Sequence, residues 1–107
     1  MNAQYKKGVL ELCVLSLLKK RDRYGYEISE YLAGHIPISD GTIYPILRKL
    51  RTDGLLTTYL QEESGGPPRK YYKLTALGHE TYEADRAEYL KFAQTVQNLL
   101  EKKDDDE

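Results

Sequence analysis

The stretch from Ser39 to Leu56 constrains the fold most strongly, because it joins a helical apolar stripe to a polar and basic opposite side. At about 100° of rotation per residue, small, polar and basic residues occupy that opposite side and its edges. The apolar stripe, at the i, i+3, i+4 and i+7 positions of a helix, is Ile43, Ile46, Leu47 and Leu50. The opposite side and its edges carry Gly41, Thr42, Tyr44, Pro45, Arg48, Lys49, Arg51 and Thr52. We expect an amphipathic helix followed by a strand, although an ordinary surface helix with solvated cations has the same pattern.

Both ends of this helix are marked in the sequence. Ser39 is the predicted N-cap, and Gly54 is the predicted left-handed residue that ends the helix. Pro45 would lie in the second turn counted from Ser39, where it removes a backbone hydrogen bond and disfavours helical geometry at Tyr44. Either the helix bends there, or its regular part begins near Pro45.

Charge is distributed unevenly, although 16 Lys plus Arg nearly balance 17 Asp plus Glu over the 107 residues. Residues 1–75 hold 12 basic and 8 acidic side chains, net +4, whereas residues 76–107 hold 4 and 9, net −5. The basic first part permits a polyanionic partner, because binding needs local rather than total positive charge. The length fits one small domain with a single core.

Cysteine usage and hydropathy indicate the compartment. Cys13 has no partner for an internal disulfide, which fits a reducing cytoplasm, and we interpret it as a small buried hydrophobe. No apolar run approaches the roughly 20 residues of a membrane span, and no signal peptide is recognisable. We therefore expect a soluble cytoplasmic protein without a membrane partner.

The elements before Ser39 follow the order of a helix-turn-helix. A short polar lead, Met1–Lys7, precedes a largely apolar helix predicted at Gly8–Lys20. A turn at Asp22–Gly25 leads to a short helix at Tyr26–Leu32, and a second turn spans Gly34–Ile38. In such an arrangement the helix after the second turn commonly enters the DNA major groove.

A β-hairpin follows this helix. Leu55–Gln61 and Lys70–Leu74 are strand-like, and the turn-forming stretch Glu62–Arg69 separates them. A plain surface hairpin would satisfy the pattern, but basic residues beside a Gly-Pro tip favour a wing that contacts DNA. These basic residues are Arg69, Lys70 and Lys73.

The last helix is predicted from Thr75 to about Lys103 and would span roughly 43 Å, more than the domain needs. Its apolar residues are Tyr82, Tyr89, Phe92, Ala93, Val96, Leu99 and Leu100, with Tyr89 and Val96 at heptad position a and Phe92 and Leu99 at d. We expect a dimerisation helix, with packing back on the first helix as the alternative. The predicted organisation is a winged helix-turn-helix at 1–74, the dimerisation helix at 75–103 in the same compact unit, and an acidic tail at 104–107.

Residue patterns for catalysis and metal binding are missing from the sequence. His35 and His79 lack metal-ligand spacing, and Gly65-Gly66 lacks the pattern of a phosphate loop. The serines have no recognisable nucleophile context. We therefore expect neither an enzyme nor a cofactor.

Three ordered motifs carry a family resemblance. They are Tyr24-Gly25-Tyr26-Glu27-Ile28; Gly41-Thr42-Ile43-Tyr44-Pro45-Ile46-Leu47 with Leu50 and Gly54-Leu55; and Gly66-Pro67-Pro68-Arg69-Lys70-Tyr71-Tyr72 with Leu74-Thr75 and Gly78. Together the motifs resemble the PadR family of transcriptional regulators, and the single helix after the wing resembles its short subgroup. The resemblance implies a mainly α winged helix-turn-helix homodimer that represses transcription at a palindromic operator. It also implies a frequent response to a small aromatic or lipophilic compound.

The resemblance and the spacing together suggest DNA contacts. By resemblance, Ser39, Thr42 and Tyr44 approach the DNA from the recognition helix, and Gly66, Arg69 and Lys70 contact it from the wing. By spacing, Arg48 could read a guanine and Lys49 a phosphate, while Lys6 and Lys7 would touch the DNA backbone.

Two questions remain open from the sequence. Tyr89, Phe92 and Val96 either line an effector space between dimer helices or form a closed dimer seam. A winged-helix module that binds a protein partner, without specific DNA binding, is the alternative function. The near-zero net charge and acidic tail favour that module slightly, whereas the basic residues and the Ser39–Pro45 motif argue more strongly for DNA binding.

Overall fold

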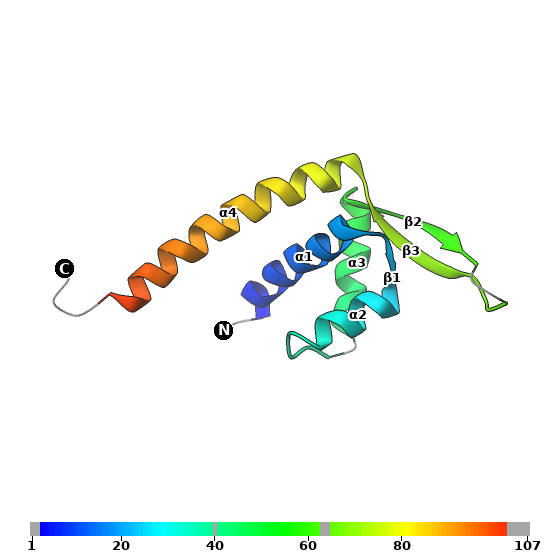
Figure 1. Ribbon diagram of the computed structural model, residues 1–107, viewed down its shortest axis with the longest axis horizontal. Helices are drawn as coiled ribbons and strands as arrows, with labels where there is room; N and C mark the ends of the chain where they lie inside the picture. Colours follow the sequence, from blue (N-terminus) through cyan, green and yellow to red (C-terminus); the bar gives the residue numbers. More distant parts are fainter. Residues whose placement is uncertain (1–2, 40, 63–64, 103–107) are drawn as a thin grey trace.

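The computed structural model describes residues 3–39, 41–62 and 65–102. Three helices form the body of the fold, the hairpin projects from one end, and the last helix extends away from the body in the opposite direction (Figure 1). The elements in chain order are α1 (Ala3–Lys20), β1 (Arg23–Tyr24), α2 (Gly25–Ala33), α3 (Ile43–Thr52), β2 (Leu56–Gln61), β3 (Arg69–Leu74) and α4 (Ala76–Glu101).

The core lies among α1, α2, α3 and the inner face of the sheet. The predicted stripe of α3 is confirmed, since each of its four residues is at most 2% exposed. From α1 come Val14, Leu15, Leu17 and Leu18, and from the sheet come Leu56, Tyr72 and Leu74. Burying this face of α3 leaves its polar and basic side toward solvent.

The hairpin prediction is confirmed, but a third strand joins it. β2 pairs with β3 in antiparallel register from Leu56 opposite Leu74 to Gln61 opposite Arg69. β1, in the segment predicted as a turn, pairs with the other edge of β3 at Tyr71 and Tyr72. A strand of two residues has no periodicity of its own, so pairing with a distant strand reveals it.

The ends of α1 and α2 differ from the prediction. α1 begins at Ala3 instead of Gly8, because residues with good helix propensity precede Gly8 and no breaker separates them from the apolar run. α2 is one residue longer at each end than predicted and has Gly34 as its C-cap.

The prediction for the start of α3 is wrong. Thr42, not Ser39, is the N-cap residue, and within the described part of the chain it makes no capping hydrogen bond through its side chain. The Ser39 hydroxyl instead lies 2.9 Å from Thr42 Oγ1. Pro45 is the third helical residue, in the first turn, where backbone N–H groups have no intrahelical acceptor. The alternative that regular helix begins near Pro45 is therefore confirmed.

The predicted left-handed end of α3 is confirmed. Gly54 has φ +80°. Its N–H donates to Arg51 O at 3.0 Å, and the next N–H, of Leu55, donates to Leu50 O at 3.0 Å. These two bonds form the Schellman arrangement, which satisfies the last carbonyls of the helix.

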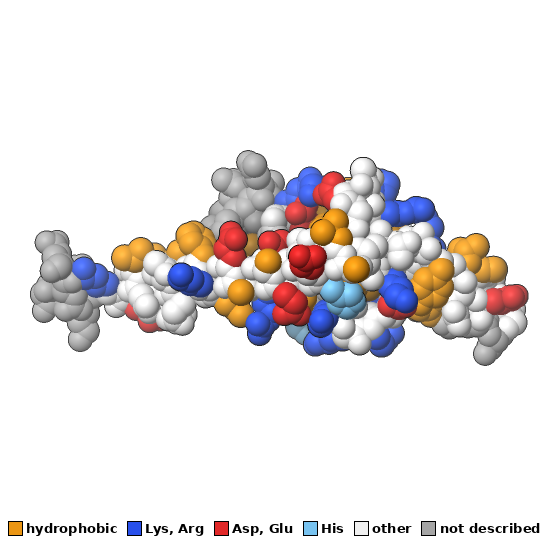
Figure 2. Space-filling view, turned by 90° about the horizontal axis from the view of Figure 1, so that it is seen from above, with side chains coloured by type: hydrophobic (Ala, Val, Ile, Leu, Met, Phe, Trp, Pro, Cys, Tyr) orange, Lys and Arg blue, Asp and Glu red, His pale blue; other side chains and the backbone are white. Residues whose placement is uncertain are grey.

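The first half of α4 confirms the alternative prediction of packing back on α1, while the dimerisation role of this helix stays a prediction. Its first half packs on α1, where Tyr82 is buried with its hydroxyl 3.4 Å from Ser16 Oγ, and Lys19 pairs with Glu83 at 3.3 Å. The second half projects beyond the body with hydrophobic side chains exposed along it (Figure 2). Leu99 and Leu100 are 66% and 80% exposed. The acidic tail at 104–107 lies outside the described residues. No helix in the described ranges is both long and apolar enough to cross a membrane.

Candidate nucleic-acid interface

A cavity of about 660 Å³ separates α3 from the wing. Cations reach it from both elements, Arg48 from α3 and Arg69 and Lys70 from the first residues of β3. The remaining wall consists of Gly25 and four tyrosines, Tyr24, Tyr26, Tyr44 and Tyr72. We call this set of eight residues the basic cradle. Cations and phenol hydroxyls around one hollow suit an anionic oxygen-rich ligand such as a phosphate backbone.

Tyr44 is held in the basic cradle by the start of α2. A Cβ atom added to Gly25 would lie 2.8 Å from Tyr44 Cε1, so the ring packs directly against glycine backbone. The side chain is still 40% exposed. A glycine at position 25 therefore leaves room for the Tyr44 ring, and its backbone angles are not unusual.

Burial and two arginines have opposite effects on the pKa of Tyr72, the buried tyrosine of the basic cradle. Burial raises the pKa of the Tyr72 hydroxyl, while Arg51 and Arg48 act on this pKa in the opposite direction. On the wall, the Arg69 guanidinium carbon lies 4.5 Å from the centre of the Tyr24 ring. The Arg69 guanidinium thus contacts the face of a phenol ring, a favourable arrangement for a cation.

Three other predicted DNA contacts gather at the start of α3. Lys7 of α1 lines a hollow of about 450 Å³ together with Ser39, Thr42 and Pro45. Lys6 lies in α1 at a position whose side chain is outside the described part. Gly66 is half-buried near the wing tip and does not line the basic cradle.

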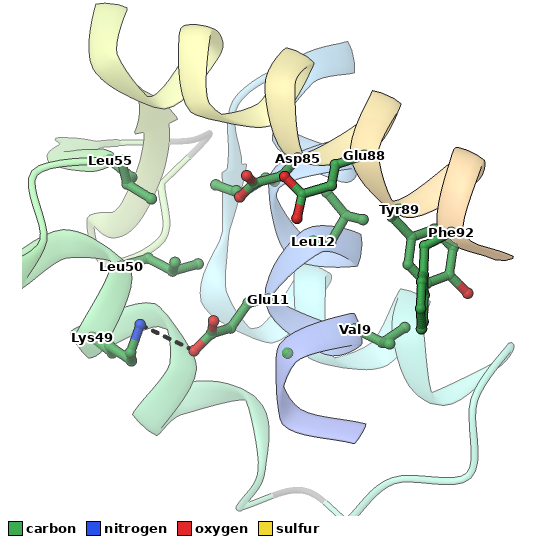
Figure 3. A pocket seen from close by; sticks show the side chains of 12 residues that line it. Val9, Glu11, Leu12, Lys49, Leu50, Leu55, Asp85, Glu88, Tyr89 and Phe92 are labelled. Atoms are coloured by element: carbon green, nitrogen blue, oxygen red, sulfur yellow. Dashed lines mark ion pairs between the residues drawn. The ribbon is translucent and has the colours of Figure 1, made fainter. Parts of the chain in front are cut away.

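Lys49 lies apart from the basic cradle. Its ammonium is 3.0 Å from Asp53 Oδ2 and 3.2 Å from Glu11 Oε1 of α1. These carboxylates raise the pKa of Lys49, and the hydrogen bond to Asp53 is the largest cause. Figure 3 shows the pair with Glu11 at the edge of a different hollow. Lys49 therefore connects α3 to α1, whereas Arg48, its neighbour in sequence, faces the wing.

That second hollow, of about 440 Å³, is the α1–α4 groove between α1, α3 and α4 (Figure 3). Val9, Leu12 and Leu15 of α1 provide apolar lining, and Tyr89 and Phe92 of α4 stand at one end. Of the residues predicted for a dimer or effector site, Tyr89 and Phe92 are brought together here. The others, Ala93, Val96, Leu99 and Leu100, lie farther along α4 and do not line the groove.

The family profile described as "Transcriptional regulator PadR-like family" matches residues 14–84, a span that includes the basic cradle. The chain belongs to the PadR-like family. A crystal structure of a PadR-like transcriptional regulator from Bacillus cereus is similar at 38% identity, with a TM-score of 0.85, over 94% of this chain and all of that one. The family shows that the chain is a winged-helix, DNA-binding transcriptional regulator rather than an enzyme.

Two curated relatives of this PadR-like chain are also similar. Transcriptional regulator YqjI of Escherichia coli is 36% identical over 83 residues, which are 74% of this chain and 38% of YqjI. Uncharacterized protein X of Lysinibacillus sphaericus is 34% identical over 76 residues, 67% of this chain and 70% of that protein. The chain therefore spans well under half the length of YqjI.

Sequence reasoning missed the contributions of Tyr24, Gly25, Tyr26 and Tyr72 to the basic cradle. The motif from Tyr24 to Ile28 supports the family resemblance but predicts no DNA contact by itself. The available signal was the small residue between two aromatic residues, which suits a close backbone approach. Its partner, Tyr44, could not be identified without the packing of α2 against α3.

Proposed function

We propose that this chain is a cytoplasmic homodimeric repressor that binds a palindromic operator and is released by a small aromatic or lipophilic effector. The observation that carries the DNA-binding surface is the convergence of Arg48, Arg69 and Lys70 on one cavity. Cations from α3 and from the wing face the same space, so one DNA segment would engage both.

The exposed face of α3 supports the proposed docking. With its apolar stripe buried, α3 presents Tyr44 and Arg48 to a DNA major groove, where arginine binds guanine O6 and N7 in a bidentate manner. Arg69 and Lys70 then meet the neighbouring phosphates. Ser39, Thr42 and Gly66, with Lys6 and Lys7, are proposed as further contacts at the flanks. Lys49 would have to leave Glu11 and Asp53 to reach a phosphate, so we assign it a minor share.

The exposed second half of α4 supports a homodimer. Phe92, Leu99 and Leu100 are 57%, 66% and 80% exposed, in a helix that leaves its own domain. A second copy is the proposed occupant of this surface, because an apolar seam at heptad spacing is complementary to itself in a two-fold arrangement. Two recognition helices about 34 Å apart would then read half-sites one helical turn apart.

The α1–α4 groove is the proposed effector site. Its apolar side chains and its two aromatic residues, Tyr89 and Phe92, suit the apolar part of an aromatic or lipophilic compound, although charged residues line the groove as well. These are Glu11, Lys49, Asp85 and Glu88. Since α4 also forms the proposed dimer interface, a compound bound there would change the separation of the two recognition helices. Such a change would release the operator without blocking the DNA-binding surface.

Selection from a pool of random duplex DNA, at about 150 mM salt, tests the central proposal. An enriched inverted repeat is expected. A failure to enrich any motif, with the protein folded and dimeric, would favour the protein-interaction module instead.

Once the operator sequence is known, the salt dependence of operator affinity tests the proposed DNA-binding surface. Each phosphate contact contributes a slope of about −0.9 to the plot of log affinity against log salt. Because each substitution removes one contact from each protomer of the proposed dimer, Arg69→Ala and Lys70→Ala should each reduce the slope by about two units. Lys102→Ala, the same charge change at the far end of α4, is the control and should leave the slope unchanged. Equal slopes in all variants would reject the wing contact.

A further inference from the structure

Three tyrosines form one row across the outer face of the sheet. Tyr71 of β3 is the register partner of Tyr24 in β1 and of Tyr59 in β2. The Tyr71 ring centre is 5.6 Å from that of Tyr24, in an edge arrangement, and 5.6 Å from that of Tyr59, in a stacked one. Side chains opposite one another on antiparallel strands share a face, so the row joins all three strands.

Each end of the row contacts a further side chain, one just before β1 and one within the hairpin. At one end, the Tyr59 hydroxyl donates to Asp22 Oδ2 at 2.8 Å, linking β2 to the segment just before β1. This bond raises the pKa of Tyr59, so the hydroxyl remains a donor throughout the neutral range. At the other end, the Arg69 guanidinium lies over the Tyr24 ring at 4.5 Å.

Arg69 lies in the part of the wing where the sheet is narrowest, so contacts from the tyrosine row can stabilise its position. Among the described residues, β1 pairs with Tyr71 and Tyr72 of β3 and not with Arg69 or Lys70, so at these two positions the sheet has two strands. An isolated two-stranded hairpin is marginally stable in water, and arginine has many rotamers to restrict. A cation held in its binding position before the ligand arrives loses less freedom on binding.

We propose that Tyr24 and Tyr59 are positioning residues for DNA binding. Tyr24 holds the Arg69 guanidinium at the basic cradle, and the bond between Tyr59 and Asp22 fixes the angle at which the wing carries Arg69 there. The inference rests on the proposed DNA-binding surface. It goes beyond that surface because Tyr59 and Asp22 do not line the basic cradle and act through the row.

Operator affinity of four variants tests the proposal. Tyr24→Leu removes the aromatic face and should weaken binding about threefold to tenfold, whereas Tyr24→Phe keeps the face and should stay within about twofold. Tyr59→Phe removes the bond to Asp22 and Asp22→Asn weakens it, so both should lower affinity, by about twofold to fivefold. The salt slope should remain that of the wild type in Tyr59→Phe, because the number of phosphate contacts is unchanged.

Two outcomes would overturn the positioning role of Tyr24. If Tyr24→Phe loses as much affinity as Tyr24→Leu, the hydroxyl itself contacts DNA. If Tyr24→Leu weakens binding equally in an Arg69→Ala background, the two residues act independently.

A measurement without DNA separates this inference from the proposed function. Ring currents should shift the side-chain proton resonances of Arg69 in the free protein. The shift should persist in Tyr24→Phe, disappear in Tyr24→Leu and shrink in Tyr59→Phe. Unshifted Arg69 resonances in the wild type would reject the proposal even if the operator is bound. Shifted resonances in a protein that binds no DNA would instead reject the proposed function.

Discussion

Replacing Gly25 with Ala should separate DNA affinity from stability. Gly25 is the first residue of α2, a position where Ala is at least as compatible with a helix as Gly. The added Cβ, however, would lie 2.8 Å from Tyr44 Cε1. Since carbon atoms normally approach to about 3.5–4.0 Å, the ring must move by roughly 1 Å. Tyr44 is 40% exposed, so it can swing toward solvent instead of compressing the core.

The expected size of the effect follows from what Tyr44 loses. If the Tyr44 hydroxyl donates to a DNA phosphate oxygen in the proposed complex, that hydrogen bond contributes about 1.5–3 kcal/mol, and a displaced ring would retain part of it. We expect Gly25→Ala to weaken operator binding by about 1–2 kcal/mol, roughly fivefold to thirtyfold. The free energy of unfolding should change by no more than about 1 kcal/mol, because helix propensity and the ring displacement act in opposite directions.

Fluorescence anisotropy with the selected duplex, alongside thermal unfolding, would measure both quantities. Gly8→Ala is the matched control, because Gly8 is a helical glycine in α1 whose added Cβ would meet no described atom within 4 Å. It should leave affinity unchanged. Wild-type affinity in Gly25→Ala would refute the reasoning. An undiminished effect of Gly25→Ala in a Tyr44→Ala background would refute it as well, because the loss would then not pass through the ring.

Three further predictions concern packing, charge and reactivity. Gly78→Ala should lower the free energy of unfolding by about 1–3 kcal/mol, measured by denaturant titration, because the new Cβ would collide with a backbone carbonyl between α3 and β2. Lys49→Met should cost about 0.2–1 kcal/mol at pH 7 by removing ion pairs with Asp53 and Glu11. Because these partners raise the pKa of Lys49, its contribution is present below the unfolded pKa of 10.5 and is lost as pH rises through the folded value. From neutral pH upward, wild-type and variant melting curves should therefore converge in alkali. Burial raises the pKa of Cys13, so at pH 8 iodoacetamide should alkylate the folded protein several-fold more slowly than the unfolded chain, as followed by mass spectrometry.

Local physics explains which parts of the fold were predictable from the sequence. The stripe of α3 has a 3.6-residue period, and Gly54 is needed where the chain turns left-handed, so both could be placed from sequence alone. The N-cap of α3 was misplaced because Ser39 and Thr42 both suit that role and their hydroxyls instead contact each other. Pro45 indicates the start of α3 more reliably than either hydroxyl residue, since proline is favoured in the first turn of a helix.

The site was less predictable because it is assembled from distant segments. A helical wheel places Arg48 and Lys49 near the same polar side of α3, yet Arg48 reaches the wing and Lys49 reaches Glu11 of α1. Which edge of a helix faces which neighbour is a tertiary property. The same holds for Tyr24, whose role depends on the pairing of β1 with β3 across more than forty residues of chain.

The junction of α3, the wing and α4 explains how a signal at α4 could reach the DNA-binding surface. Thr75, directly after β3, donates through Oγ1 to Gly54 O at 2.6 Å and accepts from Gly78 N at 2.9 Å, while its own N–H donates to Leu55 O at 3.0 Å. The end of α3, the end of the wing and the start of α4 are thus bonded at one residue, without a flexible linker between them. In the proposed dimer, a change in the crossing of the two α4 helices would therefore move each recognition helix together with its wing. Regulation would then act on the spacing of two intact DNA-binding surfaces rather than on the contacts within either one.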